Sequence, residues 1–320
     1  MHILITGVSG FIGQALAADL KDRSGAFVRG VVRRLPEHLQ EQGLFQVVGL
    51  GPETDWREAL SGIDVVVHAA ARVHVMDAAT HDPLAEFRCV NVDGTLNLAR
   101  QAVDARVRRF IYISSIKVNG EETVLDMPYT ADDAPSPRDP YAISKHEAEE
   151  GLRQLAAATG LEVVIIRPPL VYGPGVKANF LTMMHWLYRG IPLPLGAVHN
   201  KRSLVALENL VDLIITCINH PAAANQVFLA GDGKDLSTPE LLRGLADALG
   251  KPARLIPVPM TWLAAGAAVL GKRDIYQRLC GSLQVDISKA RKLLDWCPPV
   301  SVEMALRTTA WNYLESHRVR

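Results

Sequence analysis

The stretch Ile3-Leu4-Ile5-Thr6-Gly7-Val8-Ser9-Gly10-Phe11-Ile12-Gly13 decides the fold of this chain. Its first four residues predict a buried strand, and residues 14–22 behind it predict a helix. The three glycines between them follow the pattern G-x-x-G-x-x-G. Such a turn needs glycine for its tight bend, for close approach of the backbone to a pyrophosphate, and for packing of helix on strand. Strand, glycine turn and helix together predict a dinucleotide-binding site.

The start of this first helix is where we expect the cofactor's phosphates. Its free N–H groups face the turn, and the helix dipole favours negative charge there. The residues of the turn expected to bind the cofactor are Gly7, Ser9, Gly10, Phe11, Ile12 and Gly13.

Runs rich in Val and Ile alternate with helical segments over the first half of the chain. We expect strands at 27–32, 45–48, 63–68, 109–113 and 161–166, and helices at 83–104 and 140–160. Continuous apolar strands separated by helices indicate a parallel sheet covered on both faces. The predicted fold class is α/β, a doubly wound parallel Rossmann sheet with a smaller, mostly helical C-terminal substrate domain.

Prolines and glycines become frequent beyond Arg167 and interrupt this alternation. We therefore expect residues 1–170 to form the dinucleotide-binding Rossmann domain, with 203–231 packing back onto it. Residues 171–202 and 232–320 are expected to form a substrate-binding lid. Helices are predicted there at 205–219, 238–249, 260–270, 288–294 and 302–316.

Composition limits the partners and the compartment. The chain has 34 Lys plus Arg and 34 Asp plus Glu, so no overall charge favours nucleic acid or an anionic membrane. Its 4 cysteines are scattered, which favours a reducing cytosol over a disulfide scaffold or a metal site. The longest apolar stretch, 260–270, is too short to span a bilayer, and no signal peptide is predicted. We expect a cytoplasmic protein without a metal and without membrane insertion.

Two arginines, Arg33 and Arg34, follow the second predicted strand. In Rossmann folds an acidic residue at this place binds the ribose hydroxyls of NAD, whereas arginine accommodates the 2′-phosphate of NADP. The planar guanidinium pairs well with phosphate oxygens. The alternative, solvated loop charges, stays open. The sequence favours NADP(H), with NAD(H) as the alternative.

Three residues form a candidate catalytic set. Tyr141 and Lys145 are four residues apart at a predicted helix start, which puts both side chains on one face. A nearby ammonium lowers the phenol's pKa from about 10 by favouring the phenolate. Ser115 follows the strand at 109–113, at the carboxyl edge where open α/β sheets bind ligands. A tyrosine–lysine pair alone is common, so the prediction rests on its combination with the serine and the glycine turn.

With these motifs the chain resembles the extended short-chain dehydrogenase/reductase family, in its NAD-dependent epimerase/dehydratase branch acting on nucleotide sugars. The resemblance covers the whole chain, through residues 6–13, 64, 68–71, 91–95, 114–115, 141–145, 167–168, 286–290 and 293–296. It implies that Tyr141 is the general acid/base, that Lys145 binds the nicotinamide ribose, and that Ser115 orients the substrate carbonyl.

The same resemblance implies further contacts. Besides Tyr141 and Lys145, it adds Ala69, Ala70, Ala71 and Pro168 to the cofactor site. Asn179 and Arg202 resemble contacts to the diphosphate of the substrate. Arg278 is a second such candidate, and a solvated helix charge is the alternative. Asn91 is expected to be structural, near the active-site helix, and His68 and His74 are expected to be structural or to line the pocket.

Departures from the family pattern narrow the chemistry. Ile116 and Lys117 stand where 4,6-dehydratases carry an acid–base Asp-Glu pair, so dehydration is not expected. Leu50 replaces an aspartate that contacts adenine. The arginine pair and the stretch 114–121 favour an NADPH-dependent 4-reductase of a UDP-4-keto-6-deoxy-N-acetylhexosamine, of the UDP-N-acetyl-quinovosamine type, for surface polysaccharide.

Four functions remain open at this point, the reductase and three alternatives to it. The chain is either that reductase, an NAD-dependent UDP-sugar 4-epimerase, a reductase of steroid-like ketones, or an NADP-sensing binding module without catalysis. The presence of Ser115, Tyr141 and Lys145 favours an enzyme. Family members often dimerise through the helices at 83–104 and 140–159, so a homodimer is a further expectation.

Overall fold

The computed structural model describes residues 1–33, 44–47, 49–73 and 82–318. Arg34, half of the predicted arginine pair, and His74 lie outside the described residues. Within them, seven parallel strands form one sheet in the order β3-β2-β1-β4-β5-β6-β9. The strands are β1 (His2–Thr6), β2 (Phe27–Val32), β3 (Leu44–Gln46), β4 (Val65–His68), β5 (Arg109–Ile113), β6 (Glu162–Arg167) and β9 (Val227–Leu229). The strand order reverses beside β1, so the predicted doubly wound Rossmann sheet is confirmed.

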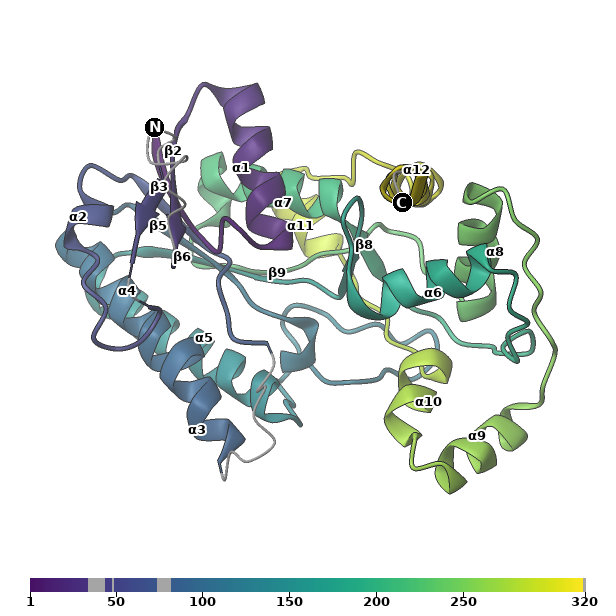
Figure 1. Ribbon diagram of the computed structural model, residues 1–320. Helices are drawn as coiled ribbons and strands as arrows, with labels where there is room; N and C mark the ends of the chain where they lie inside the picture. Colours follow the sequence, from purple (N-terminus) through teal and green to yellow (C-terminus); the bar gives the residue numbers. More distant parts are fainter. Residues whose placement is uncertain (34–43, 48, 74–81, 319–320) are drawn as a thin grey trace.

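Helices cover both faces of this sheet (Figure 1). One face carries α1 (Phe11–Ser24), α7 (Leu207–Asn219) and α11 (Ser288–Leu294), and the other carries α2 (Arg57–Leu60), α4 (Gly94–Asp104) and α5 (Pro140–Thr159). Alternate residues of a strand point to opposite faces. Accordingly Ile3 and Ile5 of β1 lie in the first apolar cluster, whereas Leu4 lies in the second.

The helix predicted at 83–104 is divided into three parts. It begins as α3 (Pro83–Phe87), passes through a π-helical turn (Arg88–Asp93) and continues as α4. Helices with such wide turns often carry functional contacts there. Here Asn91 donates from Nδ2 to Ser144 Oγ on α5 at 3.0 Å and to the backbone oxygen of Arg72 at 3.0 Å. Asn91 therefore connects α5 to the chain that follows β4, which is the structural role expected for it from the sequence.

Sequence signals explain where α5 begins and ends. Asp139 precedes Pro140, and its Oδ1 accepts the backbone N–H of Ala142 at 2.6 Å, which satisfies one free donor of the first turn. The helix ends at Gly160, whose φ of 77° is the left-handed conformation that glycine adopts readily. Helix α5 therefore has a defined first turn, and two of the candidate catalytic residues, Tyr141 and Lys145, lie in its first two turns.

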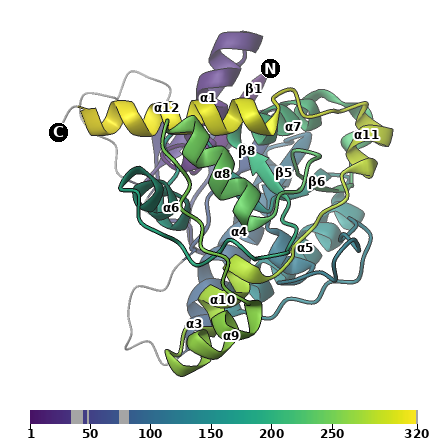
Figure 2. The ribbon, with the colours of Figure 1, turned by 90° about the vertical axis from the view of Figure 1, so that its right-hand side faces the viewer.

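The C-terminal part holds a third apolar cluster. Its elements are the two-stranded parallel sheet of β7 (Leu170–Tyr172) and β8 (Leu204–Ala206), with α6 (Ala178–Tyr188), α8 (Thr238–Ala248), α9 (Met260–Val269), α10 (Arg273–Cys280) and α12 (Val302–Arg318). Figure 2 shows α12 crossing one end of the molecule and α9 with α10 at the other. Of the described residues, no helix is long and apolar enough to cross a membrane.

The domain division expected from the sequence stays a prediction, but one segment differs from it. Residues 232–320 were expected to form part of the lid. Ala290 and Leu294 of α11, and Trp296 behind it, instead lie in the apolar cluster of β1 and α7. Apolar side chains at positions i and i+4 lie on one face of a short helix. In α11 this face packs against the sheet and α7.

A buried ion pair connects α5 to the sheet. Glu149 of α5 and Arg167 of β6 are fully buried, with Oε2 and Nη2 2.5 Å apart and Oε1 and Nε 2.9 Å apart. Ser114 donates its hydroxyl to Glu149 Oε1 at 2.6 Å, and Arg167 Nη1 donates to Asn119 Oδ1 at 2.9 Å. Both charges thus have partners in good geometry, as buried charges require.

We predict that Glu149→Leu destabilises the protein by about 3–5 kcal/mol, because it leaves a buried guanidinium without its counter-charge. The double variant Glu149→Leu/Arg167→Met should recover much of this loss, since no buried charge then remains. Urea unfolding measures both. Arg57→Met, which breaks the exposed ion pair with Asp55, is the control and should leave stability unchanged. A Glu149→Leu variant as stable as the parent would contradict the prediction.

Candidate active site at the carboxyl edge of the sheet

The glycine turn after β1 is too crowded for side chains at two positions. Gly7 has a φ of 72°, and a Cβ added to it would lie 2.8 Å from the backbone nitrogen of Ala70. A Cβ on Gly13 would lie 2.2 Å from the backbone oxygen of Gly7. Ser9 and Gly10 are exposed, and no side chain caps the first turn of α1. Bare backbone donors therefore face outward at a helix start, which fits the pyrophosphate of a dinucleotide.

The chain after β4 packs against this turn through buried polar groups. Thr6 Oγ1 lies 2.7 Å from His68 Nδ1 and accepts the backbone N–H of Ala70 at 3.3 Å. His68 Nε2 lies 3.0 Å from Thr95 Oγ1. Burial, together with the nearby charge of Lys145, lowers the pKa of His68 to about 3. His68 is therefore a neutral, structural residue that places Ala69, Ala70 and Ala71 beside the glycine turn.

Lys145 is buried beneath the site, on the side of α5 that faces β5. Its Nζ donates to the backbone oxygen of Ile113 at 2.8 Å and lies 4.4 Å from the centre of the Tyr112 ring. Burial lowers the pKa of Lys145 to about 7, and the carboxylate of Glu149 opposes part of this shift. The ammonium is therefore held at the strand end where the sequence predicted a ligand.

Tyr141 is half-buried, with its ring edge against Phe87 at a centre-to-centre distance of 6.0 Å. We expected the ammonium of Lys145 to lower the tyrosine's pKa. The pKa of Tyr141 is instead raised to about 12, first by burial and then by the negative charge of Asp139. Burial disfavours the phenolate, and here it outweighs the effect expected of the lysine.

Ser115 lies at the end of β5, at the start of a 3₁₀ turn (Ile116–Val118), where its Oγ accepts the N–H of Lys117 at 3.3 Å. The ammonium of Lys117 pairs with Oδ2 of Asp139. Because Asp139 also caps α5, this ion pair joins the serine's loop to the tyrosine's helix. The sequence interpretation missed Asp139, although an Asp before a Pro is the ordinary signal of a helix start.

The remaining predicted cofactor contacts lie around this edge. Pro168 is buried after β6, and its carbonyl oxygen accepts the N–H of Ile116 at 3.0 Å. Arg33 is exposed directly after β2. Leu50 stands where family members carry the aspartate that contacts adenine. Its backbone packs against the start of α4, and a Cβ on Gly94 would lie 1.8 Å from the Leu50 oxygen. That contact requires the glycine of the 91–95 motif.

The predicted substrate residues come from three separate segments. Asn179 is exposed in the first turn of α6. Arg202 is half-buried, donates from Nη1 to the Gly281 oxygen at 3.1 Å, and has no carboxylate within ion-pair distance among the residues described. Burial lowers its pKa. Arg278 is exposed and donates from Nε to the Asp274 oxygen of its own helix at 3.2 Å.

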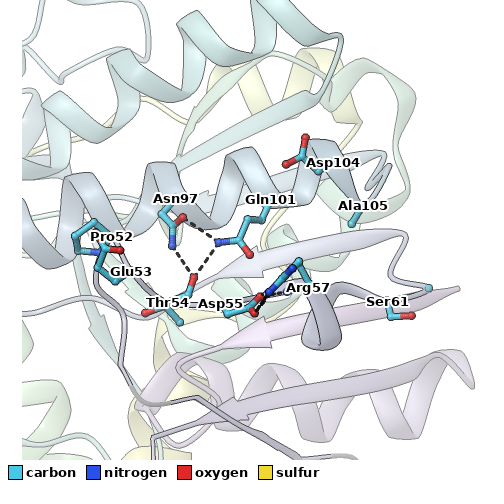
Figure 3. Close-up of a pocket in the computed structure, with 11 residues that line it drawn as sticks. Pro52, Glu53, Thr54, Asp55, Arg57, Ser61, Asn97, Gln101, Asp104 and Ala105 are labelled. Atoms are coloured by element: carbon cyan, nitrogen blue, oxygen red, sulfur yellow. Dashed lines mark hydrogen bonds and ion pairs between the residues drawn. The ribbon is translucent and has the colours of Figure 1, made fainter.

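A hollow of about 740 Å³ lies away from these residues, between the loop before α2 and the outer side of α4 (Figure 3). Its polar groups bond to one another: Asn97 Nδ2 and Gln101 Nε2 both donate to the Thr54 oxygen, at 2.8 and 2.9 Å. None of the predicted site residues lines it. Within the described ranges, no cluster of His, Cys, Asp and Glu has the makeup of a metal site either.

Comparison with known proteins agrees with this geometry. Residues 3–231 match the sequence profile of the NAD dependent epimerase/dehydratase family. The chain belongs to this family. It is 49% identical over 317 residues to a UDP-glucose 4-epimerase of Vibrio cholerae, covering 98% of this chain and 96% of that protein. The prediction of an NAD(P)-dependent enzyme is thereby confirmed, and the non-catalytic alternative is wrong.

Solved structures of this family share the fold. A UDP-glucuronic acid 4-epimerase of Bacillus cereus in complex with NAD superposes with a TM-score of 0.78 at 21% identity, covering 99% of this chain and all of that one (100%). The RMD structure of Pseudomonas aeruginosa complexed with NADPH gives a TM-score of 0.75 at 22% identity, covering 98% of this chain and 99% of that one. At these identities the likeness shows the fold alone.

The glycine turn fits a nicotinamide dinucleotide, which supplies a hydride donor or acceptor when bound. Three side chains of the chain itself carry groups that are capable of proton transfer or of hydrogen bonding to a substrate oxygen. Tyr141 in the first turn of α5 carries a phenolic proton, Lys145 one turn further along donates from Nζ to the end of β5, and Ser115 just after β5 carries a hydroxyl. This arrangement suits interconversion of an alcohol and a ketone, in which the oxygen loses or gains a proton as its carbon loses or gains a hydride.

We predict that Gly13→Ala weakens NAD(H) binding by about tenfold or more, which corresponds to ~1.4 kcal/mol. The new methyl group would collide with the Gly7 oxygen and displace the turn. Fluorescence titration with reduced cofactor measures the effect. Gly266→Ala is the matched control, because a Cβ there meets no atom within 4 Å. Unchanged binding in Gly13→Ala would remove the turn from the cofactor site.

We predict that Asp139→Asn shifts the pH profile of turnover toward lower pH on the limb that reports Tyr141. Asparagine keeps the helix cap, but it removes the negative charge that helps to raise the phenol's pKa. Asp132→Asn is the control, since Asp132 pairs with Lys289 away from the tyrosine. An upward shift, or none, would show that Asp139 does not act on Tyr141 electrostatically.

Proposed function

We propose that the protein is a UDP-sugar 4-epimerase that uses NAD(H). The observation that carries this proposal is the 49% identity, over 98% of the chain, to a protein described as a UDP-glucose 4-epimerase. This ranks the epimerase, an alternative in the sequence interpretation, above the 4-reductase that the sequence favoured. The reaction removes hydrogen from C4 of the sugar and returns it to the opposite face.

Three side chains have catalytic roles in this proposal. Tyr141 exchanges a proton with the C4 oxygen, and Ser115 orients that oxygen by a hydrogen bond. Lys145 holds the nicotinamide ribose from beneath, where its ammonium is already directed by the Ile113 oxygen. The lysine's lowered pKa means that its charge depends on pH near neutrality, so a bound cofactor that engages it also stabilises the charged form.

Arg202 is the best candidate to bind the substrate's diphosphate. The guanidinium of Arg202 is half-buried, and burial lowers its pKa. Within the described chain its hydrogen bond is to the Gly281 backbone oxygen, so no negative charge there balances its positive charge. Two phosphate groups would supply the missing negative charge in bidentate geometry. Asn179, exposed at the start of α6, is proposed as a second contact, and Arg278 as a third.

A second candidate function, the NADPH-dependent 4-reductase, has specific support from two observations. Arg33 is exposed at the end of β2, where arginine suits the 2′-phosphate of NADP. Reduction also begins with a protonated phenol, which the raised pKa of Tyr141 favours at neutral pH, whereas epimerisation first needs the phenolate. The reductase would act on a UDP-4-keto-6-deoxy-N-acetylhexosamine.

One pair of assays separates the two functions. Purified protein is incubated with UDP-glucose or UDP-N-acetylglucosamine and catalytic NAD, and the sugar products are separated by chromatography. In parallel, a 4-keto sugar nucleotide made by a 4,6-dehydratase is supplied with NADPH or NADH, and loss of reduced nicotinamide absorbance is followed. We predict 4-epimer formation without net consumption of cofactor. Stoichiometric NADPH consumption with only the keto sugar would establish the reductase instead.

Under either function, we predict that Tyr141→Phe lowers turnover by about 10²–10⁴-fold with cofactor binding retained, because the proton-transferring hydroxyl is lost. Tyr188→Phe is the matched control, since Tyr188 is an exposed tyrosine on α6. Turnover of Tyr141→Phe equal to that of the control would remove the tyrosine from the mechanism.

A further inference from the structure

Helix α9 exposes an apolar surface that the proposed reaction does not use. None of its residues is buried, and it spans nearly all of the chain's longest apolar stretch, 260–270. Trp262 is 74% exposed, Val269 is 86% exposed, and Leu270 behind the helix is 73% exposed. Large apolar side chains clustered in this way mark a surface for a partner or a membrane, whereas single exposed ones are ordinary.

The other side of this helix is anchored to the protein. Met260 and Leu263 pack against the apolar cluster of the C-terminal part, as do Tyr276 and Leu279 of α10. Both figures place α9 and α10 together at one end of the molecule, with α12 at the opposite end (Figures 1 and 2). The helix therefore has a supported inner side and presents its tryptophan outward.

Positive charge accompanies the apolar surface. Between residues 251 and 278 the basic residues are Lys251, Arg254, Lys272, Arg273 and Arg278, and the one acidic residue is Asp274. The whole chain is balanced, with 34 residues of each sign, so this excess is local. Lys272 and Arg273 are exposed directly after the apolar stretch. A tryptophan-bearing apolar helix flanked by basic residues is typical of helices that lie in the surface of an anionic bilayer.

A second copy of the chain fits this surface less well. Ten helical residues extend only ~15 Å, and a helix ~10 Å wide offers far less than the ~800 Å² per partner of a stable interface. A symmetric dimer through α9 would also bring the excess positive charge of two copies of this segment to one interface, where like charges repel. Charge and size both favour an anionic lipid surface over self-association.

We propose that residues 259–273 form a peripheral membrane-binding segment, in which Trp262, Val269 and Leu270 enter the head-group region of an anionic bilayer and Lys272 and Arg273 contact lipid phosphates. This differs from insertion across the membrane, for which the segment is too short. The balanced charge of the whole sequence had argued against an anionic membrane. The fold changes that conclusion because it gathers the exposed apolar and basic residues of one segment at one end of the molecule.

Flotation with lipid vesicles tests the proposal. The full chain is mixed at low ionic strength with vesicles of phosphatidylglycerol and phosphatidylcholine, or of phosphatidylcholine alone. We expect binding to the anionic vesicles that is at least about tenfold stronger than to the neutral ones, and that falls as salt is added. No binding to either, or equal binding to both, would overturn the proposal.

Two variants assign the binding to this segment. Trp262→Ser and Lys272→Glu/Arg273→Glu are each expected to lower anionic-vesicle binding about tenfold or more, with turnover of a water-soluble substrate unchanged. Trp311→Ser, at a tryptophan 60% exposed on α12, and Arg307→Glu on the same helix are the matched controls. Loss of binding in the controls, but not in the α9 variants, would overturn the assignment.

Quenching of tryptophan emission is measured first on the unaltered protein and then on a conservative variant. Brominated phosphatidylglycerol vesicles should quench tryptophan emission, and the quenched component should vanish in Trp262→Phe. Sedimentation at rising protein concentration tests whether a second copy of the chain binds this surface instead. Self-association that is abolished by Trp262→Ser would assign the surface to a second copy and overturn the lipid proposal.

Discussion

The close contact between the start of α1 and the end of β1 is the constraint on which the site depends. The Gly7 oxygen lies 2.2 Å from the position that a Cβ of residue 13 would take, so the start of the helix approaches the turn more closely than any side chain permits. This approach sets the path of α1 over the sheet and leaves the first N–H groups of the helix facing outward. The end of β4 is held against the same turn by hydrogen bonds in the interior, which join His68 to Thr6 and to Thr95.

Helix α5 carries the second constraint, which is electrostatic. Along it lie Asp139, Lys145 and Glu149, and each charge has a separate partner in the sheet or its loops. Glu149 and Arg167 join the middle of the helix to β6 in the interior, where an unpaired charge would cost several kcal/mol. Lys117 and Asp139 join its start to the loop of Ser115. The helix is therefore held in one position, and that position brings Tyr141 to the carboxyl edge of the sheet.

Much of the fold was predictable from local pattern. The glycine turn, the apolar strands and the Asp-Pro start of α5 are short-range signals, and the strand at 109–113 and the helix at 288–294 have the predicted bounds. The helices α6 and α10 were not predicted, because they lie among prolines and glycines and are stabilised by packing in the C-terminal cluster. The π-helical turn at 88–93 was also missed, since its wide turn accompanies contacts of Asn91 with residues far apart in the chain.

For the site, the sequence by itself determined which groups are present: a phosphate-binding turn, a serine at a strand end, and a tyrosine and lysine on one helical face. Each follows from residue type and spacing within a few positions, which local geometry governs. Only the tertiary structure decided their charge states and neighbours. Tyr141 has a raised pKa, Lys145 a lowered one, and Asp139 joins two segments, because burial and through-space charge depend on residues that the chain brings together from far apart. The exposure of the apolar surface of α9 was likewise decided by the tertiary structure, because it depends on which residues the rest of the chain leaves uncovered.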